Sequence, residues 1–149
     1  MLYKAKYDPN SCKHILDNLR FEDELEAKTL GSDWKNKLIK LIDSLKDKPV
    51  IGKSVKGDIP VLMYGVQTSD LSENVGAVWM LSTNDITKHK TSFIRQMYGI
   101  VDELNKNYDI TFNKIYKSNH FAKNWLKRVG YRFPADIEFN KLTSDDKIM

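Results

Sequence analysis

Three short apolar segments follow one another between regions of helical period, and this succession limits the possible fold more than any other feature of the sequence. The segments are PVIGKSV (49–55), IPVLMYGVQ (59–67) and VGAVWMLS (75–82), and polar turns separate them. Apolar runs of this length between turn residues are typical of strands. Because the connections are short, neighbouring strands are expected to be antiparallel. We therefore predict three consecutive strands in an antiparallel meander.

The rest of the chain alternates between strand-like and helical periods. Apolar residues recur at every second position in a half-buried strand and at spacings of three and four in a helix. The predicted elements are, in chain order, a strand in 2–8, two short helical pieces in 12–30 that separate near Arg20 and Phe21, a helix from Trp34 to Lys48-Pro49, the three strands, a helix from about Ile86 to Tyr108, a strand in 110–116, a helix after Asn119 and strands in 133–142. This order predicts an α+β fold or α/β sandwich built on one sheet.

Length and composition indicate a single globular domain. The chain has 149 residues, of which 41% are hydrophobic and 30% charged, and we expect one domain spanning 1–149. The one cysteine, Cys12, excludes an internal disulfide and fits a reducing compartment. No apolar run reaches the roughly 18 residues of a membrane-spanning helix, and the N-terminus lacks the apolar stretch of a signal peptide. We expect a protein that is neither secreted nor membrane-spanning.

The formal net charge of +4 slightly favours anionic partners, such as nucleic acid, a phosphate-bearing cofactor or an acidic protein surface. The basic residues are spread from Lys4 to Lys147, however, and a solvated lysine-rich surface explains them more simply. Nucleic-acid binding is the weakest hypothesis, because only the charge supports it.

One predicted helix combines an asparagine, an alanine and a glycine at fixed spacing. Asn119 precedes Ala122 by three residues and Gly130 by eleven, and Tyr131 follows the glycine. This spacing resembles the motif N-x-x-A-x-x-x-Y-x-x-x-G-F of the Gcn5-related N-acetyltransferases (GNAT), with Tyr131 in place of Phe. At the motif's tyrosine, often the acid that protonates the leaving thiolate, this chain has Leu126. The resemblance implies a GNAT-like fold, which is a single mixed, mostly antiparallel sheet with helices on both faces.

Three segments resemble a narrower group of proteins. DELEAKTLG (23–31), VWMLST (78–83) and NHFAKNWLKRVG (119–130) look like segments of the acetyltransferase-like proteins of podophages, a group that includes a small internal virion protein. The resemblance implies a bacteriophage protein that acts in the host cytoplasm or is part of the virion.

The GNAT resemblance implies an acetyl-CoA site at the end of the fourth strand. In that fold the strand pairs with the pantetheine arm, and the following helix directs its amides at the pyrophosphate. The family's cradle, Q/R-x-x-G-x-G/A, uses glycines for close backbone approach, whereas STNDITKHKTS (82–92) contains none. Basic side chains could replace some of the amides, and the alternative is a capped helix start with solvated lysines. The residues implied as cofactor-binding are Leu81, Thr83, Lys88, His89, Lys90 and Asn119.

Transfer of an acetyl group to an amine needs a base for the amine and an acid for the thiolate. With Leu126 at the acid position, Tyr116 and Tyr131 are the candidate acids. Glu26, and equally Glu24, could act as the base, because the N-terminal helices wall the acceptor site in the GNAT fold. A charged, solvated helix face explains both glutamates as well.

The predicted helix after Asn119 also has a purely structural interpretation. Asn119 could bond the pantetheine or the substrate, or it could cap its own helix, and both roles remain open. Gly130 is predicted to end the helix. Four apolar residues at helical spacing are predicted to be core: Phe121, Trp125, Leu126 and Val129.

Two hypotheses of different kinds follow. The first is an N-acetyltransferase that moves the acetyl group of acetyl-CoA to an amine of a protein, such as a host or virion protein, or of a small molecule. The second is a GNAT-shaped structural or interaction protein of a phage particle or of host takeover, with an eroded site, which the glycine-free cradle and Leu126 favour. The three histidines lack metal-ligand spacing and Cys12 has no identifiable partner, so we predict neither metal nor thiol chemistry.

Overall fold

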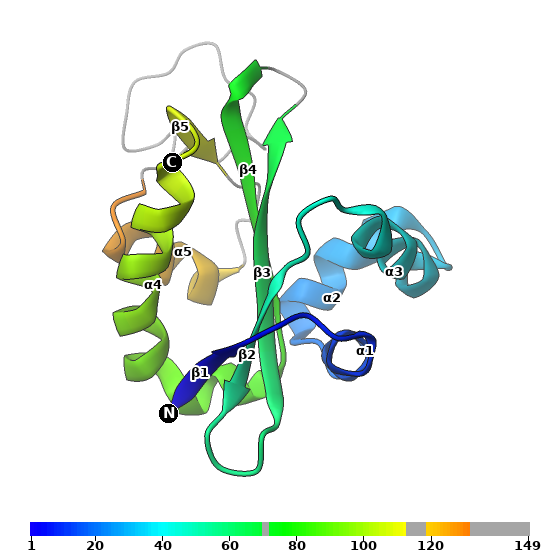
Figure 1. The fold of residues 1–149 in the computed structure, drawn as a ribbon. Coiled ribbons are helices and arrows are strands. Elements are labelled where there is room, and N and C mark those ends of the chain that lie inside the picture. The colour runs from blue at the N-terminus through cyan, green and yellow to red at the C-terminus, as the bar shows by residue number, and fades with distance from the viewer. Residues whose placement is uncertain (70–71, 113–118, 132–149) are drawn as a thin grey trace. The chain divides into compact units, whose positions relative to one another are not determined.

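The computed structural model describes residues 1–69, 72–112 and 119–131 (Figure 1). The described elements are, in chain order, β1 (Leu2–Ala5), α1 (Pro9–Asp17), α2 (Phe21–Ala27), the 3-10 helix η1 (Lys28–Leu30), α3 (Trp34–Ser44), β2 (Val50–Ser54), β3 (Pro60–Ser69), β4 (Ser72–Ser82), the 3-10 helix η2 (Asn84–His89), α4 (Lys90–Asn105), β5 (Ile110–Phe112) and α5 (His120–Arg128). The strands form one five-stranded sheet in the order β1-β2-β3-β4-β5. β2 pairs antiparallel with β1 and β3, whereas β4 and β5 pair in parallel. The predicted α+β class with one mixed sheet is confirmed.

The chain divides into two compact units. Unit 1 comprises Met1–Gly65 and Met80–Phe93, and unit 2 comprises Val66–Trp79 and Ile94–Met149. Strands β3 and β4 each contribute residues to both units. That the whole chain forms a single domain remains a prediction.

Unit 1 is built on β1, β2 and the first half of β3, with α1, α2 and α3 on one side of these strands (Figure 1). α1 begins after Asp8, whose Oδ1 accepts a hydrogen bond from the Ser11 amide at 2.7 Å, and Pro9 lies in the first turn. Residues 61–64 of β3 are all buried, so both faces of this part of the strand are covered. The most deeply buried apolar side chains of α1, β2 and β3 are Ile15, Leu16, Ile51, Val61 and Met63.

α3 is shorter than the sequence predicts. The prediction runs to Lys48-Pro49, but the helix ends at Ser44. Lys48 lies beside this end and donates from Nζ to the carbonyl oxygens of Ile42, at 3.3 Å, and Asp43. The last turn of a helix leaves carbonyl oxygens without partners inside the helix, and a lysine side chain can satisfy them. The helix therefore ends ahead of the proline that was expected to stop it.

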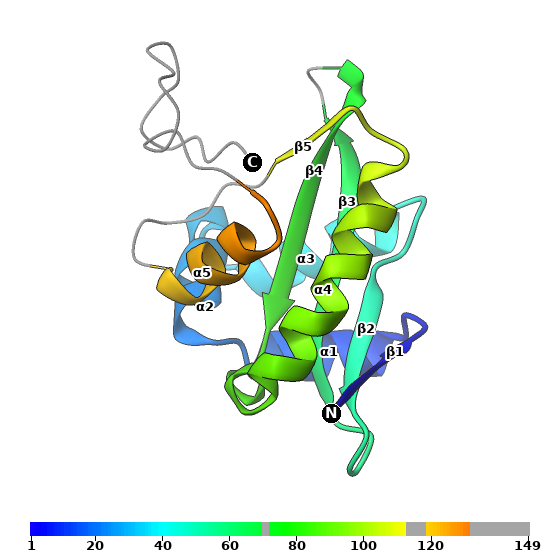
Figure 2. The same cartoon turned by 90° about the vertical axis from the view of Figure 1, so that its left-hand side faces the viewer.

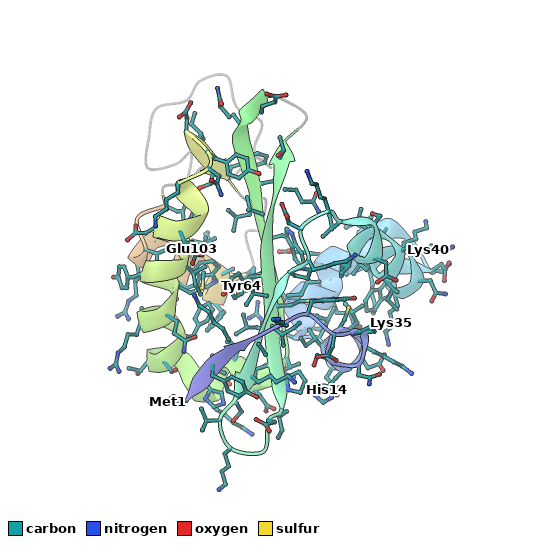
Figure 3. All side chains as sticks on the ribbon, viewed as in Figure 1. Met1, His14, Lys35, Lys40, Tyr64 and Glu103 are labelled. Carbon is teal, nitrogen blue, oxygen red and sulfur yellow. The ribbon has the colours of Figure 1, made fainter. Side chains whose placement is uncertain are left out.

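Two lysines of α3 are exposed, in different surroundings. Lys40 extends outward from the helix (Figure 3), whereas Lys35 lies beside α1. Lys35 Nζ lies 5.4 Å from the centre of the Trp34 ring and 3.3 Å from Asp17 Oδ1. On this helix, a solvated lysine-rich surface describes the basic residues well.

Unit 2 contains the second half of β3, most of β4, strand β5, most of α4 and the whole of α5. Helices α4 and α5 lie on the same side of these strands (Figure 2). Val75–Ala77 of β4 pair with Ile110–Phe112 of β5. Gly76 permits close packing there, because a Cβ at this position would lie 2.9 Å from Tyr108 ring carbons and from Val66 Cγ2. The buried apolar residues of the two helices in this unit are Met97, Ile100, Val101, Ala122, Trp125 and Leu126.

The helix predicted from about Ile86 to Tyr108 begins and ends differently in the structure. Its first part is the 3-10 helix η2, and the α-helix α4 begins only at Lys90 and ends at Asn105. Tighter 3-10 turns are frequent at helix starts. Tyr108 is outside the helix because its ring packs at Gly76, and its hydroxyl lies 3.0 Å from Thr68 Oγ1. The strands predicted in 133–142, and residues 113–116 of the predicted strand 110–116, lie outside the described residues.

Candidate functional site

The predicted phosphate cradle follows β4 in unit 1. Thr83, directly after the strand, is buried and donates its amide to the Val61 carbonyl oxygen at 2.8 Å. Its Oγ1 accepts a hydrogen bond from the Asp85 amide at 3.3 Å and so caps η2. Both the amide and the hydroxyl of Thr83 are therefore engaged within the fold.

Opposite charges lie close together at the start of η2. Asp85 is in the first turn, with Oδ1 3.3 Å from Lys88 Nζ. Amides at a helix start favour an anion, and here the Asp85 carboxylate already supplies a negative charge. Lys88 and Lys90 are exposed and could still reach a phosphate through their side chains. This segment therefore supplies basic side chains without the glycines that allow close backbone approach.

His89 contacts the beginning of β1. Its Nδ1 lies 3.1 Å from the amino nitrogen of Met1, and nearby the Leu2 amide donates to Ser92 Oγ at 3.1 Å. The pKa of His89 is lowered, first by burial of the ring and then by the positive charge of the Met1 amino group. The neutral imidazole is thereby favoured, and in that form His89 adds no charge to a phosphate site.

The edge of β4 at Ser82 is occupied by the chain itself. Neighbouring residues of a strand direct their backbone groups to opposite edges, and since the Thr83 amide faces β3, the groups of Ser82 face away from β3. The Ser82 amide and hydroxyl donate to Asp23 Oδ2 at 2.9 and 3.2 Å. The Ser82 carbonyl oxygen accepts from the Arg20 amide at 2.9 Å. An antiparallel bridge between Leu19 and Thr83 lies at the same place.

Arg20 and Asp23 also form a buried ion pair. Their side chains meet at 3.2 Å (Nη2 to Oδ1) and 3.5 Å (Nε to Oδ2), and the residues are 3% and 4% exposed. Arg20 Nη1 lies 3.4 Å from Glu22 Oε2. Buried charges are tolerated when they are paired and hydrogen-bonded. We name residues 19–23, with these bonds to Ser82, the 19–23 clamp.

The sequence analysis singled out neither Arg20 nor Asp23 as a site residue. The available signal is an arginine three residues before an aspartate at a helix start, a spacing at which opposite charges can meet. Nothing local, however, indicates that the carboxylate also reaches a strand amide 59 residues later.

The candidate base Glu26 lies three residues after Asp23 on α2 and is half-buried. Glu24 pairs with Lys28 at 2.8 Å, and both side chains are partly exposed. For Glu24 the solvated helix face is therefore the better interpretation, whereas a catalytic role for Glu26 remains a prediction.

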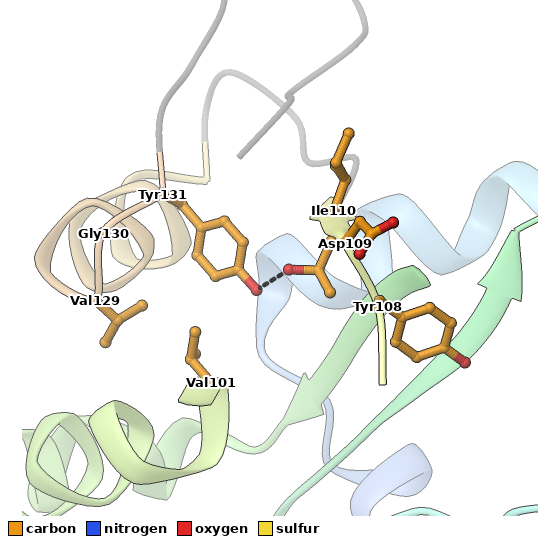
Figure 4. A pocket seen from close by; sticks show the side chains of 8 residues that line it. Val101, Tyr108, Asp109, Ile110, Val129, Gly130 and Tyr131 are labelled. Carbon is orange, nitrogen blue, oxygen red and sulfur yellow. Dashed lines mark hydrogen bonds between the residues drawn. The ribbon is translucent and has the colours of Figure 1, made fainter. Parts of the chain in front are cut away.

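Tyr131, a candidate acid, is buried in unit 2 with its hydroxyl 2.8 Å from Thr111 Oγ1 (Figure 4). Burial raises the pKa of Tyr131, and the bond to Thr111 opposes this shift. The phenol is thus kept protonated, as an acid must be. Both residues line a cavity of about 340 Å³ together with Val101, Tyr108 and Val129, among others.

Asn119 caps α5. Its Oδ1 accepts a hydrogen bond from the Ala122 amide at 3.2 Å, and the residue is 1% exposed, so the capping interpretation is confirmed. Trp125 and Leu126 are buried as predicted, whereas Phe121 and Val129 are only half-buried.

The remaining predictions concern β4 and β5. Leu81 is half-buried next to Ser82, and Tyr116 lies outside the described residues. The recorded pairing of the two strands covers Val75–Ala77 and Ile110–Phe112. Because residues 113–118 are not described, a gap between the strands remains a prediction.

Within residues 1–69, 72–112 and 119–131, no group of three or more His, Cys, Asp or Glu side chains is arranged to hold a metal ion. In the same parts of the chain, no helix has both the length and the apolar character that crossing a membrane requires.

Comparison with known proteins gives matches to solved structures. No family model and no curated protein matches the sequence. A GNAT-family acetyltransferase from Bacillus anthracis matches with a TM-score of 0.64 and 11% identity, over 99% of this chain and 89% of that chain. One from Streptococcus agalactiae matches with a TM-score of 0.56 and 13% identity, over 89% and 86%. The aminoglycoside antibiotic 6′-N-acetyltransferase of Acinetobacter haemolyticus matches with a TM-score of 0.56 and 9% identity, over 100% and 99%. At these identities the likeness concerns the fold, and the chain therefore has the fold of the GNAT acetyltransferases.

Proposed function

We propose that this protein is an N-acetyltransferase that transfers the acetyl group of acetyl-CoA to an amine of a protein or small molecule. The observation that carries the proposal is the extent of the fold likeness, since the match to the Bacillus anthracis acetyltransferase covers 99% of this chain. A shared fold alone does not establish an activity. The residues of the site must therefore be compatible with the cofactor.

The residues present fit acetyl-CoA with fewer backbone contacts than the family's cradle would give. Lys88 in η2 and Lys90, the first residue of α4, are exposed and would hold the phosphates through their ammonium groups. The edge of β4 that faces away from β3, next to Leu81, would receive the pantetheine arm. Thr83 and Asn119 would act mainly by fixing the ends of η2 and α5, because their side chains already cap these helices.

In the proposed reaction, bound acetyl-CoA supplies the activated acetyl group. Glu26 would take the proton that the amine loses as its nitrogen bonds the acetyl carbon. As the carbon–sulfur bond breaks, Tyr131 would give a proton to the thiolate, and its raised pKa supports a protonated resting form. Tyr116 is the alternative acid.

A second function is favoured by the bonds at Ser82. Arg20 and Asp23 engage the backbone of this residue on the edge that the pantetheine arm would use. Together with the glycine-free segment 82–92, this supports a GNAT-shaped structural or interaction protein of a phage virion or of host takeover. Mass spectrometry of purified particles of a phage encoding this chain, with infected-cell lysate for comparison, tests the virion version.

Calorimetry with acetyl-CoA, combined with a thiol-release assay on a panel of amines, decides between the two functions. The enzyme proposal expects saturable binding heat and acceptor-dependent release of CoA. A Lys88→Ala/Lys90→Ala variant should bind more weakly, whereas Lys35→Ala/Lys40→Ala on α3 is the matched control and should not. If millimolar acetyl-CoA gives no binding heat, the enzyme proposal is rejected.

A further inference from the structure

The 19–23 clamp lies where an extended ligand would pair with β4. We propose that Arg20 and Asp23 determine the affinity for acyl-CoA by holding this segment on the β4 edge, in competition with the pantetheine arm. The inference rests on the proposed function, because it concerns the same cofactor.

The competition follows from the alternation of a strand. Met80 and Ser82 are two residues apart, so their backbone groups face the same edge, opposite to the one where the Thr83 amide meets Val61. An arm that extends along this edge would use the groups of both residues. At Ser82, the amide already donates to Asp23 and the carbonyl oxygen accepts from Arg20. With the clamp closed, the arm cannot pair at Ser82.

The clamp bonds three groups of a single residue. The amide, hydroxyl and carbonyl oxygen of Ser82 are all bonded to residues 20 and 23, and Ser82 is 0% exposed. The clamp is also joined to the start of α2, where the Glu24 amide donates to the Arg20 carbonyl oxygen at 2.9 Å. The segment joining α1 to α2 would therefore have to move away from Ser82 before a ligand could pair there.

A double variant can open the clamp without leaving a buried charge. Arg20 has φ −55°, which proline adopts without strain, and proline has no amide hydrogen for Ser82. Arg20→Pro combined with Asp23→Leu removes the backbone bond, the ion pair and the carboxylate together. Apolar replacement of a buried ion pair is often tolerated, whereas removal of one partner is not. Arg20→Met with Asp23→Leu retains the backbone amide of residue 20, which can still donate to the Ser82 carbonyl oxygen, and so opens the clamp only in part.

The test measures acetyl-CoA affinity by calorimetry and the exchange rate of the Ser82 amide by NMR. We expect the affinity for acetyl-CoA to rise about tenfold in the Pro/Leu variant and by a smaller factor in the Met/Leu variant, because backbone groups of Ser82 become available to the ligand. The Ser82 amide should exchange faster in both variants and be protected again by acetyl-CoA. Glu22→Gln, which removes only the outer contact of Arg20, is the control and should change neither quantity.

The outcomes separate this inference from the proposed function. Equal or weaker binding in folded variants with a faster-exchanging Ser82 amide overturns the inference alone, because the clamp would then be structural or would order the strand for the ligand. No binding heat in any variant rejects the proposed function as well. If the double variants do not fold, the unaltered protein still gives a result. Saturating acetyl-CoA should then deprotect the amides of residues 20–24, and unchanged protection in the bound state contradicts displacement.

Discussion

The hydroxyl of Tyr131 and Oγ1 of Thr111 lie 2.8 Å apart in the interior of unit 2 and join the segment that follows α5 to β5. Tyr131→Phe should lower the free energy of unfolding by about 1 kcal/mol, the usual net contribution of one hydrogen bond. Thr111→Val should have a similar effect. Because both variants lose the same bond, their effects in urea unfolding should not add in the double variant.

The same pair of variants tests the catalytic assignment. If Tyr131 protonates the thiolate, Tyr131→Phe should lower kcat, whereas Thr111→Val, which leaves the phenol in place, should retain most of the turnover. An equal loss in both variants would mean that the bond positions the chain and that Tyr131 is not the acid. Single-turnover release of CoA is the measurement.

The cap of α1 predicts a pH-dependent contribution to stability. Bonds from the Ser11 hydroxyl and amide lower the pKa of Asp8 below its ordinary value of 3.8. Asp8→Ala should reduce the free energy of unfolding by about 1 kcal/mol at neutral pH. Since the folded state binds the proton less tightly than the unfolded state, this contribution is present above pH 3.8 and is lost as the pH falls through the lower folded pKa.

Urea unfolding at pH 7 and at pH 3 measures this effect. Asp8→Asn is the matched control, because asparagine caps a helix without titrating in this range. A difference between the wild type and Asp8→Ala that remains constant across the two pH values would contradict the assignment.

Two glycines should respond to alanine in opposite directions. A Cβ at Gly76 would lie 2.9 Å from both Tyr108 and Val66, so Gly76→Ala should destabilise the protein by about 1–3 kcal/mol through overpacking. Gly99 lies within α4 with nothing within 4 Å of the added Cβ, and Gly99→Ala should stabilise by about 0.5–1 kcal/mol. Thermal unfolding of the two variants checks the signs, and a stable Gly76→Ala protein would disprove the close packing at β4.

Most helices and strands could be predicted because their signals are local. Asn119 precedes an apolar helical pattern and caps α5 in the structure, and Gly130, with φ 103°, follows its last turn. The errors occurred where a contact outside the apolar helical pattern decides the boundary. Lys48 reaches back to the carbonyl oxygens of α3, and packing at Gly76 keeps Tyr108 outside α4. Neither contact can be recognised from the spacing of apolar residues in the neighbouring sequence.

The candidate site was harder to predict. Glu24, Glu26 and Asp23 are similar acidic residues in one short segment, and only the arginine three residues before Asp23 distinguishes them in the sequence. In the structure Glu24 pairs at the surface, whereas Asp23 is buried and bonds the Ser82 amide, 59 residues away. The distinction depends on which side of α2 meets β4, and that is decided by tertiary packing.

His89 predicts a loss of stability in mild acid. Its pKa lies below 6.5 in the folded state, chiefly because the ring is partly buried. The unfolded state therefore binds the proton more tightly, and the free energy of unfolding should decrease as the pH falls from 6.5. His89→Gln should remove part of this slope in unfolding titrations between pH 7 and pH 5. His14→Gln, an exposed histidine on α1, controls for the loss of a ring, and an unchanged slope in His89→Gln would contradict the prediction.

Placing the tyrosine of the GNAT motif at position 126 should not create an acid. Leu126 is 0% exposed on α5, so Leu126→Tyr must place a larger side chain and a hydroxyl in a filled interior. We expect a loss of about 1–3 kcal/mol in the free energy of unfolding from overpacking, and no gain in thiol release. Leu126→Met, which nearly conserves volume, is the control and should cost less than about 1.5 kcal/mol. A Leu126→Tyr protein as stable as the wild type with faster turnover would mean that the position faces the reacting groups, and the interpretation of Leu126 as core would then be wrong.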